Sequence, residues 1–261
     1  MQSCSKPTKK INFLGSRQIR KASFNYFCAK SRIKLTSILI PTLYLPPIEA
    51  VAIIKVSEMV IVDVHETYPR QTCRNRCRIG AANGILDMTI PVEKPNGNST
   101  PTGKVVPSTR LPWQKQHWKS ICAAYGKSAF FMHYLHLMEP FYLGSAPETL
   151  VQWNQDLQEA LFEELNIDTE IAIASTFEKE VNGMLDLRSE ISPKLKKLDS
   201  EKNLIFKPYF QPFSHKYGFL PNLSIIDALF NLGPDTPEYL DECGKKLINY
   251  YLEKHRENYR F

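Results

Sequence analysis

The densest group of polar side chains in the sequence lies between residues 63 and 77. Asp63 and His65 are close enough along the chain for the carboxylate to orient the imidazole for proton transfer. Arg74 and Arg76 follow on the same segment, and each guanidinium can bind a carboxylate or a phosphate through paired N–H donors. The segment therefore predicts a site that moves a proton beside a bound anion. The alternative is a solvated loop followed by strand residues whose outward side chains are polar.

Further polar residues extend this candidate site. His117 and Lys119 lie near the predicted start of a helix, where both side chains could face one pocket. A single histidine on a helix is also common as a surface or hydrogen-bonded interior residue. We expect the catalytic groups to be Asp63, His65 and His117. The candidates for substrate binding are Tyr44, Tyr68, Gln71, Arg74, Asn75, Arg76 and Lys119.

The sequence offers little for a metal or a common cofactor. Cys73 and Cys77 form a single CxxxC pair without a second pair at ligand distance, so we expect no metal site and interpret both as small buried side chains. His133 and His136 share a helix face but lack a third ligand. The sequence contains no GxGxxG, GxxxxGK[ST], GxSxG or HExxH motif. The cofactor, if there is one, stays unknown.

The elements that must position the polar residues begin with a βαβ unit. Residues 36–40 and 59–63 are apolar and rich in β-branched side chains, which predicts two buried strands. Pro46 and Pro47 lead into a predicted helix over residues 48–55. Ligand sites of such units lie at the carboxyl ends of the strands. Tyr44 and the segment from Asp63 to His65 should lie at that edge.

A hairpin and a mainly helical half should follow. Asn83-Gly84 between residues 74–79 and 85–92 is typical of a β-hairpin turn, and residues 104–107 should return to the sheet at an edge. The fold class is thus α/β, with a mixed sheet built on the N-terminal βαβ unit and the hairpin, followed by a mainly helical C-terminal half. Apolar spacing predicts helices over residues 113–125, 130–142, 147–165 and 237–259, and a short strand over 171–176.

Two further segments carry weaker signals. Ser224 with Asp227 resembles a capping box and predicts a helix that ends at Gly233-Pro234. The segment beyond Met184-Leu-Asp-Leu187, up to Lys207, is charged and poorly periodic, so we expect loops or a short helix there.

The positive charge is concentrated at the beginning of the chain. Nine Lys and Arg residues lie within residues 1–34, and subtracting them from the net charge of +6 leaves −3 for the rest. We interpret residues 1–34 as a disordered leader, which is a basic arm, a targeting peptide or, as we favour, sequence translated from too early a start. Residues 35–261 should then form one domain, for which nucleic acid is not an expected partner. Six scattered cysteines and the lack of a membrane-length apolar run predict a cytoplasmic protein without a membrane span.

Five segments, in this order and spacing between about Ser37 and Leu240, resemble the WbqC-like protein family. They are Tyr44-Leu-Pro-Pro-Ile48, Val62-Asp63 with His65-Glu-x-Tyr68, Gln71-x-x-Arg-Asn-Arg76, His117-Trp-Lys-Ser-Ile121 with Ala124-Tyr-Gly126, and Pro221-Asn-Leu-Ser-Ile-x-Asp227. The family takes its name from bacterial gene clusters for surface polysaccharide of the O-antigen type. The resemblance implies a bacterial protein but no particular reaction.

We therefore expect a group-transfer enzyme that acts on a small sugar or nucleotide-linked intermediate. Asp63 and His65 would handle protons, and Arg74, Asn75, Arg76 and Lys119 would bind an anionic group. The rival hypothesis is a non-catalytic binding or scaffold protein that uses the same polar residues as a recognition surface.

Overall fold

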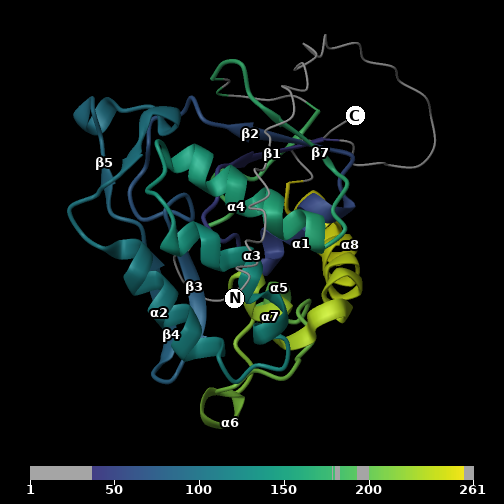
Figure 1. Cartoon of the computed structure of the whole chain (residues 1–261). Helices are drawn as coiled ribbons and strands as arrows, with labels where there is room; N and C mark the ends of the chain where they lie inside the picture. Colours follow the sequence, from purple (N-terminus) through teal and green to yellow (C-terminus); the bar gives the residue numbers. More distant parts are fainter. Residues whose placement is uncertain (1–36, 178, 180–182, 193–199, 256–261) are drawn as a thin grey trace, which may run out of the picture. The chain divides into compact units, whose positions relative to one another are not determined.

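The computed structural model describes residues 37–177, 179, 183–192 and 200–255 (Figure 1). The expected leader, residues 1–34, lies outside this part of the chain. Strand β1 (Ser37–Pro41), helix α1 (Ile48–Val56) and strand β2 (Met59–Asp63) form the predicted βαβ unit. The two strands pair in parallel along their whole length, from Ser37 opposite Met59 to Pro41 opposite Asp63.

Two later strands complete a four-stranded parallel sheet with the order β7-β2-β1-β8. Strand β7 (Glu170–Ile173) confirms the short strand predicted near residue 171 and pairs with β2. Strand β8 (Leu185–Asp186) pairs with β1 and was not predicted from the sequence. Because all four strands are parallel, their carboxyl ends meet at one edge of the sheet.

The predicted hairpin consists of β3 (Arg76–Ala81) and β4 (Gly84–Thr89). Its turn residues are Ala82 and Asn83, and Gly84 follows with a φ of 96°, a conformation that glycine adopts without strain. Strand β5 (Val92–Glu93) pairs with β6 (Val106–Pro107), with the short 3₁₀ helices η1 (Gly97–Ser99) and η2 (Thr102–Lys104) between them. These antiparallel pairs form two small sheets of their own and do not join the parallel sheet. The expectation that residues 104–107 return to that sheet is therefore wrong, because Val106 and Pro107 pair with β5 instead.

The chain after β6 is mainly helical, which confirms the α/β class and its helical second half. The predicted long helices are present with ends shifted by a few residues, and one further helix and two short ones accompany them. They are α2 (Trp113–Tyr125), α3 (Phe131–Leu143), α4 (Leu150–Glu164), α5 (Ser200–Asn203), α6 (Ser214–Tyr217), α7 (Ile225–Leu232) and α8 (Thr236–Lys254), with a 3₁₀ turn η3 (Gly233–Asp235) before α8. Gly233 ends α7 with a φ of 58°, as its position predicts.

The expected capping box at the start of α7 is wrong. The Ser224 side chain makes no capping hydrogen bond. The Asp227 carboxylate instead accepts hydrogen bonds from Tyr125, Tyr209 and Gln211 at 2.8, 2.6 and 2.8 Å. Asp227 is fully buried, so these three donors replace the water that the carboxylate would otherwise bind.

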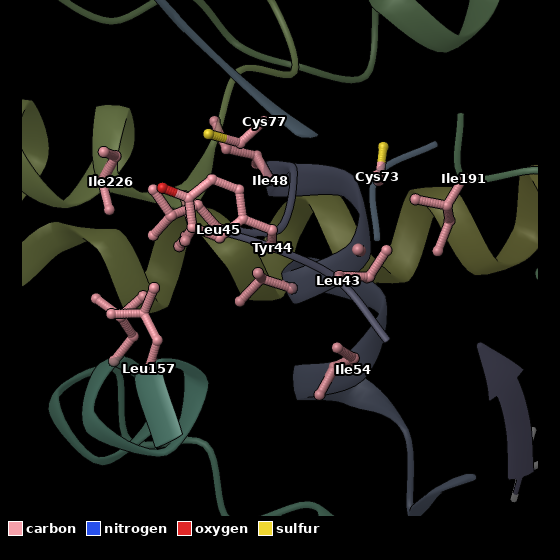
Figure 2. Close-up of a cluster of buried hydrophobic side chains, with 14 of the residues drawn as sticks. Leu43, Tyr44, Leu45, Ile48, Ile54, Cys73, Cys77, Leu157, Ile191 and Ile226 are labelled. Carbon is pink, nitrogen blue, oxygen red and sulfur yellow. The ribbon is translucent and has the colours of Figure 1, made fainter. Parts of the chain in front are cut away.

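The segment between β1 and α1 is central to the core. Leu43, Tyr44 and Leu45 are at most 1% exposed and belong to one apolar cluster with Cys73 and Cys77 (Figure 2). Both cysteines are buried free thiols, and burial raises their pKa, that of Cys73 to about 12. They are therefore the small buried side chains that the sequence predicted.

Helix α1 is covered by the last helix, α8, which runs beside it (Figure 1). The two backbones approach closely at Gly244, where a Cβ atom would collide with the carbonyl oxygen of Ala52 and would lie 2.9 Å from Val56 Cγ1. Glycine inside a helix costs about 1 kcal/mol relative to alanine, so its presence here reflects this close approach. Among the described helices, none is both long and apolar enough to cross a membrane.

Candidate functional site

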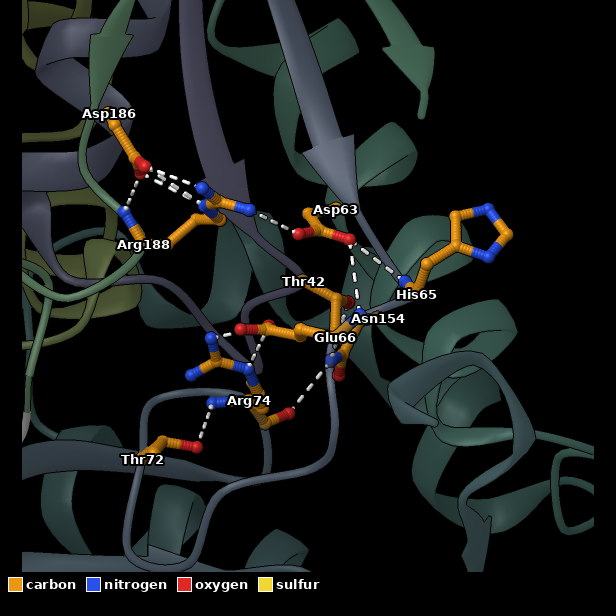
Figure 3. A network of polar contacts seen from close by, with 9 residues as sticks. All are labelled: Thr42, Asp63, His65, Glu66, Thr72, Arg74, Asn154, Asp186 and Arg188. Atoms are coloured by element: carbon orange, nitrogen blue, oxygen red, sulfur yellow. Dashed lines mark hydrogen bonds and ion pairs between the residues drawn. The ribbon is translucent and has the colours of Figure 1, made fainter. Parts of the chain in front are cut away.

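Polar side chains gather at the carboxyl edge of the parallel sheet (Figure 3). Asp63 is the last residue of β2 and Asp186 the last of β8, and Ala174 follows the end of β7. Parallel pairing brings these three chain positions to one edge although they are far apart in sequence. We call the residues Asp63, His65, Glu66, Arg74, Asp186 and Arg188 the edge cluster.

Arg188 links the ends of β2 and β8. Its Nη1 lies 2.7 Å from Asp63 Oδ2, and its Nη2 lies 2.6 Å from Asp186 Oδ2. The pKa of Arg188 is raised, first by hydrogen bonds to Asp186 and further by those to Asp63. Asp63 is 1% exposed, and the positive charge of Arg188 compensates for the burial of the Asp63 carboxylate.

Asp63 also orders the backbone that follows it. Its Oδ1 accepts hydrogen bonds from the backbone N–H groups of His65 and Glu66, at 2.8 and 3.3 Å. The expected contact between this carboxylate and the His65 imidazole is wrong, since both Asp63 oxygens are already used by a backbone turn and by Arg188. Asp63 therefore positions the site and does not orient the imidazole.

A backbone carbonyl holds the His65 ring instead. Nε2 of His65 lies 2.8 Å from the carbonyl oxygen of Ala174. Because a carbonyl can only accept, Nε2 carries the proton in this contact, and the neutral ring has Nδ1 as its proton acceptor. The His65 side chain is exposed, so this acceptor is within reach of a ligand at the edge.

Glu66 and Arg74 form the second ion pair of the edge cluster. The Nε and Nη2 atoms of Arg74 lie 2.7 and 2.5 Å from Glu66 Oε1, and the side chains are 3% and 15% exposed. The pKa of Glu66 is raised, mainly by burial of its carboxyl group. The positive charge of Arg74 lowers this pKa, and the negative charge of Asp63 raises it further. Asn154 holds the backbone of Arg74 from behind, because its Nδ2 donates to the Arg74 carbonyl oxygen at 2.8 Å and to Thr42 Oγ1 at 3.0 Å.

Tyr44 and His117 lie in the core and not at the edge. The Tyr44 hydroxyl is 2.8 Å from Nδ1 of His117 and 2.7 Å from the Tyr142 hydroxyl. Burial lowers the pKa of His117 to about 4, against a hydrogen bond to the backbone of Thr89 that raises it. A buried neutral histidine of this kind supports the packing of α2 onto the hairpin, and the expectation that it shares a pocket with Lys119 is wrong because Lys119 is exposed.

The other substrate-binding candidates are dispersed. Tyr68 is buried, with a raised pKa, and Asn75 is buried with its Nδ2 donating to the Ile90 carbonyl oxygen. Gln71 is exposed on the loop before Arg74, with a φ of 56°. Arg76 donates from Nε to Thr89 Oγ1 across the hairpin. Of the ten predicted site residues, the edge cluster therefore unites Asp63, His65 and Arg74.

The edge cluster also contains residues that sequence reasoning missed. Asp186 and Arg188 follow the apolar residues Met184 and Leu185. Polar residues after an apolar strand also led to the prediction of Asp63, but here the apolar run is shorter. Glu66 lay within the polar segment but was not selected. Among the described residues, no group of three or more His, Cys, Asp and Glu side chains is arranged to hold a metal ion.

Comparison with known proteins gives a family and one uncharacterised relative. The sequence model of the WbqC-like protein family matches residues 42–239. The chain is 25% identical to the uncharacterised protein Rv1507c of Mycobacterium tuberculosis over 210 residues, which cover 72% of this chain and 89% of that protein. No solved structure matches the sequence significantly.

Proposed function

We propose, from the premise that this chain belongs to the WbqC-like protein family, that the edge cluster binds a small molecule and transfers a group to or from it. The substrate class we propose is a sugar or a nucleotide-linked intermediate of bacterial surface-polysaccharide synthesis. The observation that carries the proposal is the His65 ring, held at Nε2 by Ala174 with Nδ1 as acceptor, at the same strand edge as the Glu66–Arg74 pair. The described cysteines are free thiols, which fits a cytoplasmic enzyme.

In this proposal His65 is the general base. Nδ1 takes the proton of the attacking hydroxyl or amine as that atom bonds to the transferred group, and the leaving group departs with its bonding electrons. Asp63 and Arg188 keep the backbone of residues 65 and 66 in place through the hydrogen bonds described above. Gln71, exposed beside this loop, remains a predicted substrate contact.

Arg74 is the proposed contact for an anionic group of the substrate. Glu66 occupies Nε and Nη2 of Arg74, and Nη1 has no hydrogen-bond partner within the described ranges. A substrate phosphate or carboxylate can bind Nη1, or displace Glu66, whose raised pKa eases its protonation.

A second candidate, non-catalytic recognition, rests on the same ion pairs. Arg74 and Arg188 are both paired with carboxylates of this chain, which is an arrangement suited to a rigid recognition surface. The two functions differ in one property, which is turnover.

The test is a thermal-shift screen of the full chain against nucleotides, nucleotide sugars and acyl and aminoacyl donors, followed by an assay for product with each ligand found. A ligand at 100 times its Kd should stabilise the fold by about 2.7 kcal/mol. We expect Arg74→Lys to weaken ligand binding, and His65→Ala to keep binding but lose product formation. Arg110→Ala is the control, since that side chain is 84% exposed.

Each result of this screen has a defined meaning. Binding without product in the wild type supports the recognition protein. Product formation that persists in both His65→Ala and Arg74→Lys excludes the edge cluster as the catalytic site.

A further inference from the structure

A polar pocket lies between strand β3, the start of α1 and the segment before α7. Glu49, Arg76, Arg78, Asn222 and Ser224 contribute polar groups to its lining. No edge-cluster residue is among the described residues that line it. The pocket is therefore separate from the proposed transfer site.

Two arginines of one strand line the pocket. Arg76 and Arg78 are two residues apart on β3, so their side chains leave the same face of the strand. Nε of Arg76 donates to Thr89 Oγ1 at 3.0 Å, and Nε of Arg78 lies 3.4 Å from Asp87, which is half exposed. In the part of the chain that the structure describes, the Nη atoms of both arginines have no hydrogen-bond partner, and they are the donors that bind oxyanions.

The acidic residue of the pocket is neutralised by its own neighbours. Glu49 is 3% exposed, and its Oε1 lies 2.6 Å from Lys202 Nζ and 2.5 Å from the Tyr251 hydroxyl. Asn222 Nδ2 donates to Oε2 at 2.9 Å. Because Lys202 balances the charge of Glu49 and Asp87 balances that of Arg78, Arg76 leaves the pocket with a net positive charge.

Ser224 provides a donor that lacks a partner. The residue is 1% exposed, and within the described residues its hydroxyl forms no hydrogen bond. Buried hydroxyl groups are normally hydrogen-bonded, so this one points to a missing acceptor. An oxygen atom of a ligand in the pocket would supply it.

Two helices begin beside the pocket. Pro47 precedes α1 and Ser224 precedes α7, and these two residues form an isolated β-bridge. The amino-terminal ends of both helices therefore lie close together. Their first N–H groups are bonded to the Leu223 and Pro46 carbonyl oxygens, so the helix ends favour an anion only through their partial positive charge. The helix ends, the two guanidiniums and the unpartnered hydroxyl all favour the same kind of ligand.

We infer that this pocket binds the oxyanion group of a small molecule, either a phosphate or a carboxylate, between Arg76, Arg78 and Ser224. The two guanidinium groups bind two oxygens of the ligand. The Ser224 hydroxyl donates to a third oxygen of a phosphate, or to one of the same two oxygens of a carboxylate. The pocket acts independently of the edge cluster, as a second ligand site on the chain.

The test is calorimetric titration of the full chain with inorganic phosphate, pyrophosphate and malonate at constant ionic strength. We expect saturable binding of at least one of the three, weakened about tenfold or more by Arg76→Ala or Arg78→Ala. Ser224→Ala should weaken binding about tenfold as well. The Ser224 hydroxyl has no hydrogen bond to any described residue, so the thermal midpoint of this variant without ligand should stay unchanged, which separates loss of binding from loss of folding.

Two controls locate the binding. His65→Ala and Arg110→Ala should bind the anion as the wild type does. Selective binding of the phosphates identifies a phosphorylated ligand, and selective binding of malonate identifies a carboxylate ligand; both support the site. The absence of saturable binding, unchanged affinity in the Arg76→Ala and Ser224→Ala proteins, or a loss of binding in His65→Ala overturns it.

Discussion

Arg188 and Asp63 form an ion pair with an N–O distance of 2.7 Å across 125 positions of sequence. The pair joins the carboxyl ends of β2 and β8, which are not neighbours in the sheet. It is the contact that fixes the backbone beneath the proposed general base.

Removal of Arg188 should strongly destabilise the fold. In Arg188→Ala the Asp63 carboxylate, 1% exposed, stays buried without its cation, and such a loss typically costs about 3–5 kcal/mol. Urea unfolding followed by circular dichroism measures this change. Arg110→Ala, on an exposed side chain, should change the unfolding free energy by less than about 0.5 kcal/mol. Equal midpoints for the two variants would show that the pair contributes nothing to stability.

His65→Gln tests the role of Nδ1 separately from the position of the ring. The glutamine Nε2 can still donate to the Ala174 carbonyl oxygen, but the side chain has no group that accepts a proton near neutral pH. We expect ligand binding within about twofold of wild type and a fall in kcat of about 100-fold or more, which is typical for loss of a general base. Steady-state kinetics with the donor found in the ligand screen provide the measurement. A variant with wild-type kcat would remove His65 from the chemistry.

His117 should make stability depend on pH. Its pKa is about 4 in the folded protein and about 6.5 in the unfolded chain, so between these values the unfolded chain binds more protons. Stability from this group is therefore present above about pH 6.5 and is lost as the pH falls towards about 4. Between about pH 7 and pH 5 the loss is about 2 kcal/mol.

Paired urea titrations at these two pH values isolate the His117 contribution. His117→Gln should lose about 2 kcal/mol less than wild type over this interval, whereas His133→Gln, on an exposed side chain, should follow wild type. An identical pH dependence in all three proteins would contradict a buried neutral His117.

Gly244→Ala should destabilise the contact between α1 and α8. The new methyl group would meet the Ala52 carbonyl oxygen and Val56, and separating the helices to admit it costs about 1–3 kcal/mol, which exceeds the gain in helix propensity. Lys245→Ala, at the adjacent exposed position, should leave the thermal midpoint nearly unchanged. If Gly244→Ala instead raises the midpoint, the helices have room that the structure does not show.

The sequence predicts the elements of this fold better than their contacts. The apolar strands, the hairpin turn and the ends of α2 and α7 follow from local residue types, such as Gly84 and Gly233, whose backbone conformations few other residues adopt. Strand β8 has only two residues, and so short a segment shows no periodicity. Its position is decided by pairing with β1, a contact that depends on the whole fold.

The same limit applies to the candidate site. Asp63, His65 and Arg74 were predicted because polar residues follow a buried strand. The partner of Asp63 could not be predicted, because Arg188 reaches it only after β8 has joined the sheet. The acceptor for His65 is a backbone carbonyl, which every residue has and which leaves no signal in the sequence. His117 was misplaced because its hydrogen-bond partner, Tyr44, is 73 positions away in the sequence.

The contact between α1 and α8 has a consequence for how the protein is made. Seven of the nine residues of α1 are buried, and α8, which covers it, begins only at Thr236, 180 positions after α1 ends at Val56. Before α8 is synthesised, α1 exposes the apolar surface that α8 covers in the folded protein. Such exposed surfaces bind chaperones or aggregate. Ribosome-bound chains that end before residue 236 should therefore be sensitive to protease within α1, and chains that include α8 should be protected.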